Sequence, residues 1–148
     1  MQKISFEITT PNGVAYKDFV DEISLPTTMG EITVLPNHIP LVSILKPGEL
    51  KVKKDGNMEF LATAGGFIEV QPGNRVVVLA DNAERAEEID IERAEKARQR
   101  AEALMKEKQV DNVEYAALAS KLEREIARIK VAKRHRSRMA GISEILSS

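Results

Sequence analysis

The chain of 148 residues contains no cysteine, and it has only two histidines, His38 and His135. Without cysteine, neither a disulfide framework nor thiolate chemistry is available. Two imidazoles are few for a transition-metal site, so we expect no metal ligand. The sequence also lacks a G-x-x-x-x-G-K loop, and no helix is expected directly after Gly65-Gly66. We therefore expect a non-catalytic protein and assign no catalytic residue.

Long apolar runs are absent as well. A helix that spans a bilayer needs about 20 consecutive apolar residues, and no run here approaches that length. The start MQKISFEITT lacks the apolar stretch of a secretory signal. Hydrophobic residues make up 43% of the chain, which is ordinary for a globular protein. We expect a folded protein of a cytosol-like compartment.

Charge and helix-breaking residues are unevenly distributed. Residues 1–84 hold 7 Lys/Arg and 11 Asp/Glu, whereas residues 85–148 hold 15 and 12. All six prolines and seven of the eight glycines precede residue 74, and these residues favour turns over helices. The composition predicts a strand-rich domain over residues 1–84 and a helical domain over residues 85–148.

Apolar residues alternate with polar ones in the first domain. Ile4, Phe6 and Ile8 define one such run, and a period of two indicates half-buried strands. Many short strands separated by turns favour a sandwich or a flattened barrel. Similar runs occur at Val20, Ile23 and Leu25, at Ile32 and Val34, at Leu50 and Val52, and at Val76 and Val78, with turn sequences at Pro11-Asn12-Gly13, Asp55-Gly56 and Pro72-Gly73-Asn74.

The second domain changes to a helical period. Its pattern predicts two antiparallel helices joined near residues 109–112, and Gly141 is predicted to stop the second helix. The first stripe is mostly alanine, which buries little apolar area, so we expect a weakly held hairpin that can open. The two stripes are Ala94, Ala97, Ala101, Leu104 and Met105, then Leu118, Leu122, Ile126 and Ile129.

Two segments carry a family resemblance. Residues 30–41 read GEITVLPNHIPL and residues 65–70 read GGFIEV. They resemble G-E-L-G-I-L-P-G-H-x-P-L and G-G-F-x-E-V of the epsilon subunit of bacterial and chloroplast rotary (F-type) ATP synthases. Thr33 and Asn37 stand where glycine is usual. Asn37 tolerates a left-handed backbone, whereas Thr33 implies an ordinary one.

The resemblance implies a ten-stranded β-sandwich followed by a two-helix hairpin. It further implies a non-catalytic rotor subunit of a proton- or sodium-translocating synthase, whose sandwich binds the gamma stalk and the c-ring. Glu31 and His38 match the family's contact surface by position. The alternative to a contact role is that His38 is a loop residue whose ring makes only a local hydrogen bond. We expect the protein to be located at the cytoplasmic face of a bacterial plasma membrane, or at a plastid thylakoid membrane. We expect it to be attached to the membrane only through the complex.

The segment EEIDIERAEKARQR, residues 87–100, allows two interpretations. In the first, Asp90 caps a helix and Ile89 fixes its start. In the second, the segment forms part of an anion site, because it matches the I/L-D-x-x-R-A motif by which many bacillus-like epsilon subunits bind ATP. One arginine of the family's ATP site corresponds to Ala117 in this sequence. The resemblance implies ATP as a regulatory ligand, bound by Glu84, Ile89, Asp90, Arg93, Ala94, Arg100, Arg124 and Arg128.

The chain becomes strongly basic near its C-terminus. Nucleic-acid binding is an alternative function for this stretch, although it has no interleaved aromatic residues for base stacking. The resemblance instead implies that the opened hairpin reaches the alpha/beta catalytic hexamer and sets these cations against acidic beta-subunit segments, which inhibits ATP hydrolysis. The basic residues of this segment are Lys130, Lys133, Arg134, Arg136 and Arg138.

Overall fold

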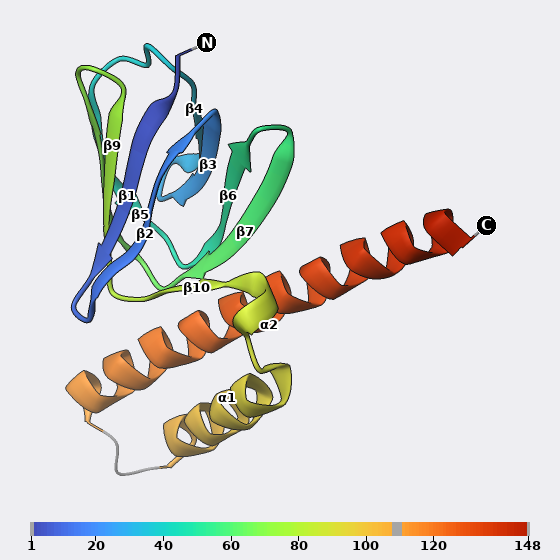
Figure 1. Ribbon diagram of the computed structural model, residues 1–148. Coiled ribbons are helices and arrows are strands. Elements are labelled where there is room, and N and C mark those ends of the chain that lie inside the picture. The colour runs from blue at the N-terminus through green and yellow to red at the C-terminus, as the bar shows by residue number, and fades with distance from the viewer. Residues whose placement is uncertain (1, 108–110, 148) are drawn as a thin grey trace. The chain divides into compact units, whose positions relative to one another are not determined.

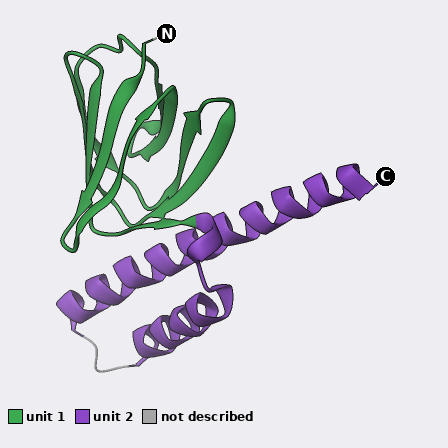
Figure 2. Cartoon of the chain, in the orientation of Figure 1, with its two compact units in different colours: residues 1–85 green, residues 86–148 purple. Residues whose placement is uncertain are grey.

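The computed structural model describes residues 2–107 and 111–147. The chain divides into two compact units, residues 1–85 and residues 86–148 (Figure 2). The first unit is built from strands and the second from helices (Figure 1). The predicted fold class, a β-sandwich followed by a two-helix region, is confirmed.

Ten strands lie in the described part of the first unit. They form one hydrogen-bonded sheet in the order β10-β7-β6-β3-β5-β8-β9-β1-β2, and β4 pairs with β3. β1 runs parallel to β9 and antiparallel to β2. The strands are β1 (Ile4–Thr10), β2 (Gly13–Val20), β3 (Glu22–Thr27), β4 (Gly30–Val34), β5 (Leu41–Leu45), β6 (Gly48–Lys54), β7 (Asn57–Thr63), β8 (Gly66–Gln71), β9 (Arg75–Ala80) and β10 (Ala83–Arg85).

The sheet encloses one apolar core, and the alternation in the sequence explains which residues enter it. Ile4, Phe6 and Ile8 are at most 1% exposed, whereas the residues between them are only partly buried. The Phe6 ring packs against the Tyr16 ring of β2 with centroids 5.6 Å apart. Side chains of one strand face alternately inward and outward, so each predicted run contributes every second residue to the core.

The predicted turns connect neighbouring strands. Asp55 and Gly56 have φ angles of 51° and 80° between β6 and β7, as a two-residue hairpin turn with positive φ requires. Asn37 has a φ of 68°, which confirms its predicted left-handed backbone. Thr33 lies within β4 in extended conformation, also as predicted.

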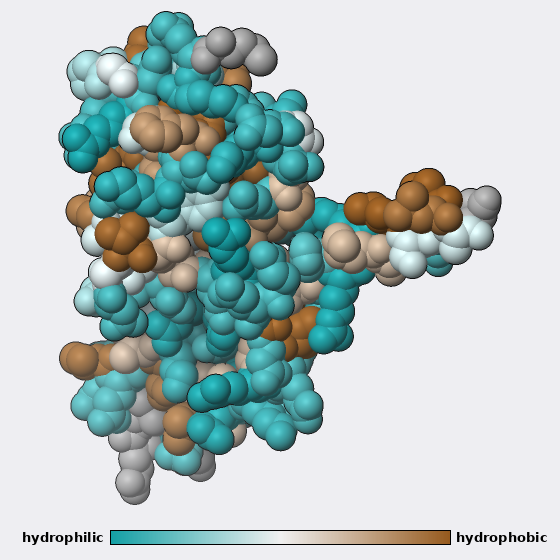
Figure 3. Space-filling view, in the orientation of Figure 1, coloured by the Kyte–Doolittle hydropathy of each residue, from teal (hydrophilic) through white to brown (hydrophobic). Residues whose placement is uncertain are grey.

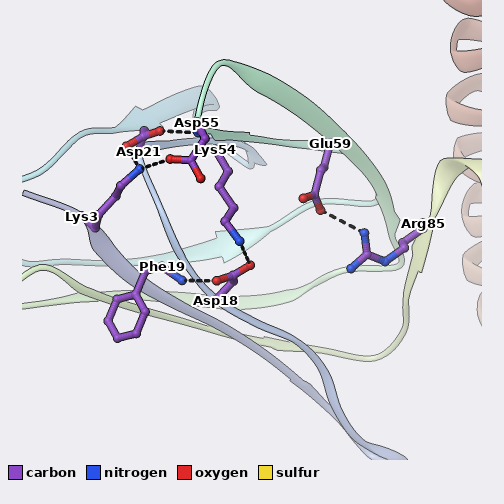
Figure 4. Close-up of polar contacts among 8 residues, drawn as sticks. All are labelled: Lys3, Asp18, Phe19, Asp21, Lys54, Asp55, Glu59 and Arg85. Carbon is purple, nitrogen blue, oxygen red and sulfur yellow. Dashed lines mark hydrogen bonds and ion pairs between the residues drawn. The ribbon is translucent and has the colours of Figure 1, made fainter.

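Ion pairs connect charged side chains from several strands and turns of the sandwich (Figure 4). Lys3 Nζ lies 2.5 Å from Asp21 and 2.8 Å from Asp55, and Lys54 pairs with Asp18. The Lys3 ammonium lowers the pKa of the Asp21 carboxyl below its ordinary value, with help from the Asp55 backbone N–H. The first two pairs connect the residue before β1 with the residue before β3 and with the β6–β7 turn, and the third pair connects β6 with β2.

The last strand of the sandwich is held by a second set of contacts. Arg85 of β10 pairs with Glu59 of β7 at 3.0 Å (Figure 4). The same guanidinium lies over the Tyr16 ring, 5.4 Å from its centroid. A cation over an aromatic face is attracted by the ring quadrupole. A strand of three residues thus gains side-chain contacts beyond its ladder with β7.

The second unit holds a 3-10 turn, η1 (Ala86–Glu88), and two helices, α1 (Ile91–Met105) and α2 (Asn112–Ser147). Asp111 caps α2 by accepting a hydrogen bond from the Glu114 backbone N–H at 2.7 Å. Two residues of the predicted connection, Gln109 and Val110, lie outside the described residues. With 36 residues against 15, α2 extends well beyond α1 (Figure 1).

The prediction that Gly141 stops the second helix is wrong, because α2 continues to Ser147. Glycine inside a helix costs about 1 kcal/mol relative to alanine. Its neighbours Met139, Ala140 and Leu146 are good helix formers. Their preference outweighs a single glycine, and α2 keeps its helical path through it.

Candidate functional site

Asp90 caps the first turn of α1. Its Oδ1 accepts a hydrogen bond from the Arg93 backbone N–H at 3.1 Å, and its own backbone is extended, as in most N-cap residues. Ile89, directly before it, is 7% exposed. The first interpretation of residues 87–100, a capped helix start, therefore describes the structure. A ligand-binding role for Asp90 stays a prediction.

A short repeat arranges the charges of α1. The sequence Arg-Ala-Glu occurs at residues 93–95 and again at residues 100–102. Its alanines, Ala94 and Ala101, are 0% and 2% exposed. Seven residues are close to two helical turns, so the two alanines lie on one line along the helix. The arginines therefore lie on one flank of this buried line and the glutamates on the other.

The glutamate flank is neutralised within the hairpin. Arg98 lies 3.0 Å from Glu95 and 2.8 Å from Glu102. Lys133 of α2 reaches Glu95 at 3.4 Å and so joins the two helices. The hydrogen bond from Arg98 lowers the pKa of Glu95, and Lys133 adds to the effect. Each acid of this flank has a cationic neighbour.

The arginine flank is different. Arg93 and Arg100 are exposed and Arg124 of α2 is partly buried, and none of the three has an ion pair among residues 2–107 and 111–147. Like charges on one helix face repel by a few tenths of a kcal/mol. An anion that contacted Arg93 or Arg100 would therefore displace no carboxylate of the described residues.

The four arginines of the predicted set lie on the two helices of the hairpin, Arg93 and Arg100 on α1 and Arg124 and Arg128 on α2. Within each helix the two arginines share one face, because spacings of seven and of four residues are close to whole numbers of helical turns.

Arg128 already has a carboxylate partner. Its Nη1 lies 2.8 Å from Oε2 of Glu125, one turn earlier on α2. Glu125 is 5% exposed, and the Arg128 side chain is 20% exposed. Sequence reasoning missed this pair. The three-residue spacing was the available signal, but spacing alone does not tell a buried pair from a solvated one.

Glu84, the remaining member of the predicted ATP set, belongs to the first unit. It lies in β10, where it pairs with Ala62 of β7. It is partly buried. The other seven predicted residues lie in the second unit.

The basic segment lies on α2. Lys133 of this segment pairs with Glu95 of α1. In the compact hairpin one cation of the basic segment therefore contributes to the contact between the two helices. Lys130 and Arg136 are exposed. Beyond them an apolar cluster gathers at the C-terminal end of α2 (Figure 3). Its exposed members are Met139, Ile142, Ile145 and Leu146.

The predicted partner residues of the sandwich lie on its surface. Glu31 in β4 is exposed and lies 3.6 Å from Lys51. His38 is partly buried, and its Nδ1 donates to the Ile39 carbonyl at 2.7 Å. The local hydrogen bond of the alternative for His38 is therefore present. A contact role for either residue stays a prediction.

An apolar band on the outer face of the sheet was missed by sequence reasoning. Ile44 pairs directly with Phe67, which pairs with Leu79, and the line continues through Thr9 to Val14. Directly paired residues point to the same face of a sheet. Its four apolar members are 52% to 58% exposed. The run RVVVLA, apolar at both alternating positions, was a signal for a strand with two apolar faces.

Comparison with known proteins identifies the family. The family model described as ATP synthase, Delta/Epsilon chain, beta-sandwich domain matches residues 3–86. The model for the long alpha-helix domain of the same chains matches residues 87–133. The chain belongs to the ATP synthase epsilon family. As a member it is a central-stalk subunit of the F-type ATP synthase, and the nucleic-acid alternative is not favoured.

Relatives named ATP synthase epsilon chain match most of this epsilon-family chain. The protein of Dehalococcoides mccartyi strain CBDB1 is 45% identical over 92% of this chain and 96% of its own length. That of Chloroflexus aggregans is 47% identical over 90% and 94%. That of Halalkalibacterium halodurans is 37% identical over 90% and 100%. The resemblance stated from the sequence is therefore confirmed.

Solved structures agree with the epsilon-family assignment. A chain of the Euglena gracilis mitochondrial ATP synthase, from the OSCP/F1/c-ring structure in rotational state 1, is 27% identical with a TM-score of 0.73, covering 86% of this chain and 79% of that one. A chain of the Tetrahymena thermophila central stalk/c-ring structure has 17% identity and a TM-score of 0.56, over 88% and 97%, and shares the fold.

The described residues of this epsilon-family chain include neither a membrane-spanning helix nor a cluster of metal-binding side chains. Within residues 2–107 and 111–147, no helix combines the length and apolar character needed to cross a membrane. In the same residues no three or more side chains of His, Asp or Glu cluster in a way that could hold a metal ion.

Proposed function

We propose that this subunit joins the gamma stalk to the c-ring and restrains ATP hydrolysis through its helical hairpin, whose compact state is stabilised by bound ATP. It carries out no catalysis itself. It acts peripherally at the cytoplasmic face of a bacterial plasma membrane, or at a thylakoid membrane, and its contact with the membrane is through the complex.

The apolar band supports a partner role for the sandwich. Ile44, Phe67 and Leu79 expose more than half of their side-chain surface on one line across three strands. Contiguous exposed apolar surface marks interaction sites. We assign this face to gamma, and we assign Glu31 and His38 to the contact with stalk and ring on the family motif.

The arginine flank is the observation that carries the regulatory part of the proposal. Arg93 and Arg100 share a face of α1 beside the buried alanines. Guanidinium groups bind phosphate oxygens in bidentate geometry. These residues fit a nucleoside triphosphate, because Glu95 and Glu102 lie on the opposite flank and pair with Arg98.

The basic segment supports the inhibitory part. α2 carries its cations beyond the length of α1, and the exposed apolar cluster follows them. In the open hairpin this end of α2 is free to contact the alpha/beta hexamer, where cations pair with acidic beta-subunit segments. ATP opposes this by binding the compact state and not the open one, since a ligand shifts a population through its differential affinity.

An ATP titration of the isolated chain tests the regulatory proposal. We expect the melting temperature of the helical signal to rise, because ATP at 100 times its Kd stabilises the compact state by about 2.7 kcal/mol. Arg93→Ala and Arg124→Ala should reduce the rise, whereas the control Arg136→Ala should keep it. An unchanged melting temperature of the unmutated chain at millimolar ATP would contradict the proposal.

A further inference from the structure

Glu125 is a buried carboxylate that the proposed function does not use. It is 5% exposed, and one of its oxygens receives a hydrogen bond from Arg128 at 2.8 Å. Most other acids of the hairpin lie at the surface, such as Glu92, which is 84% exposed beside Lys96. A buried charge is costly unless it is paired and hydrogen-bonded, so Glu125 depends on Arg128.

One member of this pair, Arg128, belongs to the predicted nucleotide set. Of the four arginines in that set, Arg128 is the one for which the described structure shows a carboxylate partner. A phosphate group that binds Arg128 must share or displace the Glu125 carboxylate. The two anions therefore compete for one guanidinium.

We propose that Glu125 competes with the nucleotide phosphates for Arg128 and thereby weakens ATP binding to the compact hairpin. This inference rests on the proposed function, because it concerns the affinity of the same site. Two effects act against ATP: the carboxylate repels the triphosphate, and it loses its own partner when Arg128 turns to a phosphate. Glu125 is thus a residue that sets the ATP concentration at which the hairpin closes.

The consequence is that removing the charge should tighten binding. Glu125→Gln keeps the length of the side chain and removes its charge. Hydrogen bonds to charged groups are strong enough for one such exchange to change affinity by about tenfold. We therefore expect the Kd for ATP to fall by about that factor.

The test is isothermal titration of ATP into the full chain, with Glu123→Gln as the matched control. Glu123 is exposed on the same helix, two residues away, and its substitution should leave the Kd unchanged. Circular dichroism without nucleotide shows whether each variant keeps its helix content. Glu125→Ala, which also removes the carboxylate and favours helix, provides a second variant if the glutamine variant loses structure.

The outcomes separate the two proposals. A lower Kd for Glu125→Gln, with Glu123→Gln at the unmutated value, supports competition. Binding in the Glu125 variant alone also supports competition, but it contradicts the proposed ATP regulation of the unmutated chain. An equal or higher Kd overturns the inference while the proposed function stands. If neither the unmutated chain nor the Glu125 variants bind ATP, the proposed function fails and the inference with it.

Competition can also be distinguished from general charge repulsion. On an Arg128→Ala background, Glu125→Gln should change the Kd for ATP much less than on the unmutated background, because the shared guanidinium is gone. The same fold-change on both backgrounds would show that the two residues act independently, and it would overturn competition for Arg128.

Discussion

At two positions of the sandwich, Gly66 and Tyr16, the surrounding atoms determine which side chain the position accepts and how it titrates. Gly66 has a φ of 146°, and a Cβ there would lie 1.9 Å from the Leu79 carbonyl oxygen. The contact explains why this position of β8 accepts no side chain beside β9. Tyr16 is a contrasting case, because its hydroxyl is buried without a hydrogen-bond partner in the described part of the chain. Burial, with the negative charges of Glu59 and Asp18, raises its pKa to about 12.

Tyr16→Phe tests this residue directly. We expect the free energy of unfolding at neutral pH to fall by no more than about 1 kcal/mol relative to the unmutated chain, or to rise, because an unsatisfied buried hydroxyl is removed. The pKa of Tyr16 is raised from 10.0 to about 12 in the folded chain. Titration of Tyr16 therefore does not change the stability of the fold below pH 10, and it lowers that stability as the pH rises from 10 toward 12, where the unfolded chain releases the phenol proton more readily.

Urea denaturation at several pH values measures this effect. Between pH 10 and 12 the stability of the unmutated chain should fall more steeply than that of the Tyr16 variant. Tyr115→Phe is the control, since Tyr115 is 50% exposed on α2. Parallel pH curves for the unmutated chain and Tyr16→Phe would show that Tyr16 does not contribute to the loss of stability between pH 10 and 12.

At the scale of elements, the two helices differ in how they are stabilised. α1 buries alanines along one line and balances its acids with Arg98 and Lys133. The C-terminal part of α2 extends past α1 and exposes its apolar cluster. Helix propensity contributes to the stability of this part, and Gly141 is its least favourable position.

Gly141→Ala should therefore strengthen the end of α2. A Cβ at this position meets no atom within 4 Å, so the gain is that of helix propensity, about 1 kcal/mol. We expect amide hydrogen exchange in residues 137–147 to slow by up to about fivefold. Ser143→Ala is the control and should give a smaller effect. Equal exchange rates before and after Gly141→Ala would show that this segment is not limited by glycine.

At the scale of the whole molecule, the family models match residues 3–86 and 87–133. Residues 134–148 extend beyond them and include both basic and apolar surface. The proposed inhibition can therefore be tested in this segment without disturbing the rest. A cut after Lys133 keeps Ile129, Val131 and Ala132, which are buried.

Deletion of residues 134–148 should raise ATP hydrolysis by the assembled enzyme severalfold, because it removes Arg134, Arg136 and Arg138, three of the five cations proposed to pair with the beta subunit. Assembly should be unaffected, since the sandwich is intact. The measurement is the hydrolysis rate of reconstituted enzyme, with co-purification of gamma as the check on assembly. Hydrolysis equal to that of the full-length enzyme would remove the inhibitory role from this segment.

Several features followed from sequence alone because their causes are local. The alternation of Ile4, Phe6 and Ile8 produced a strand, and Asp55-Gly56 produced a tight turn. The Asp90 cap needed only its own helix turn. In each of these cases the determining residues lie within a few positions of one another. The ten strands and the subunit identity had another source, the resemblance of residues 30–41 and 65–70 to a known family.

Tertiary structure decided the features that join distant parts of the chain. The apolar band exists because pairing brings Ile44, Phe67 and Leu79 into register. The contact of Lys133 with Glu95 depends on the helix register, and the burial of Glu125 depends on folding of the chain around α2. A local pattern determines which conformation a segment prefers, whereas burial and charge pairing depend on which segments meet. For that reason the sequence alone could predict the hairpin, but not which of its arginines already had a carboxylate partner.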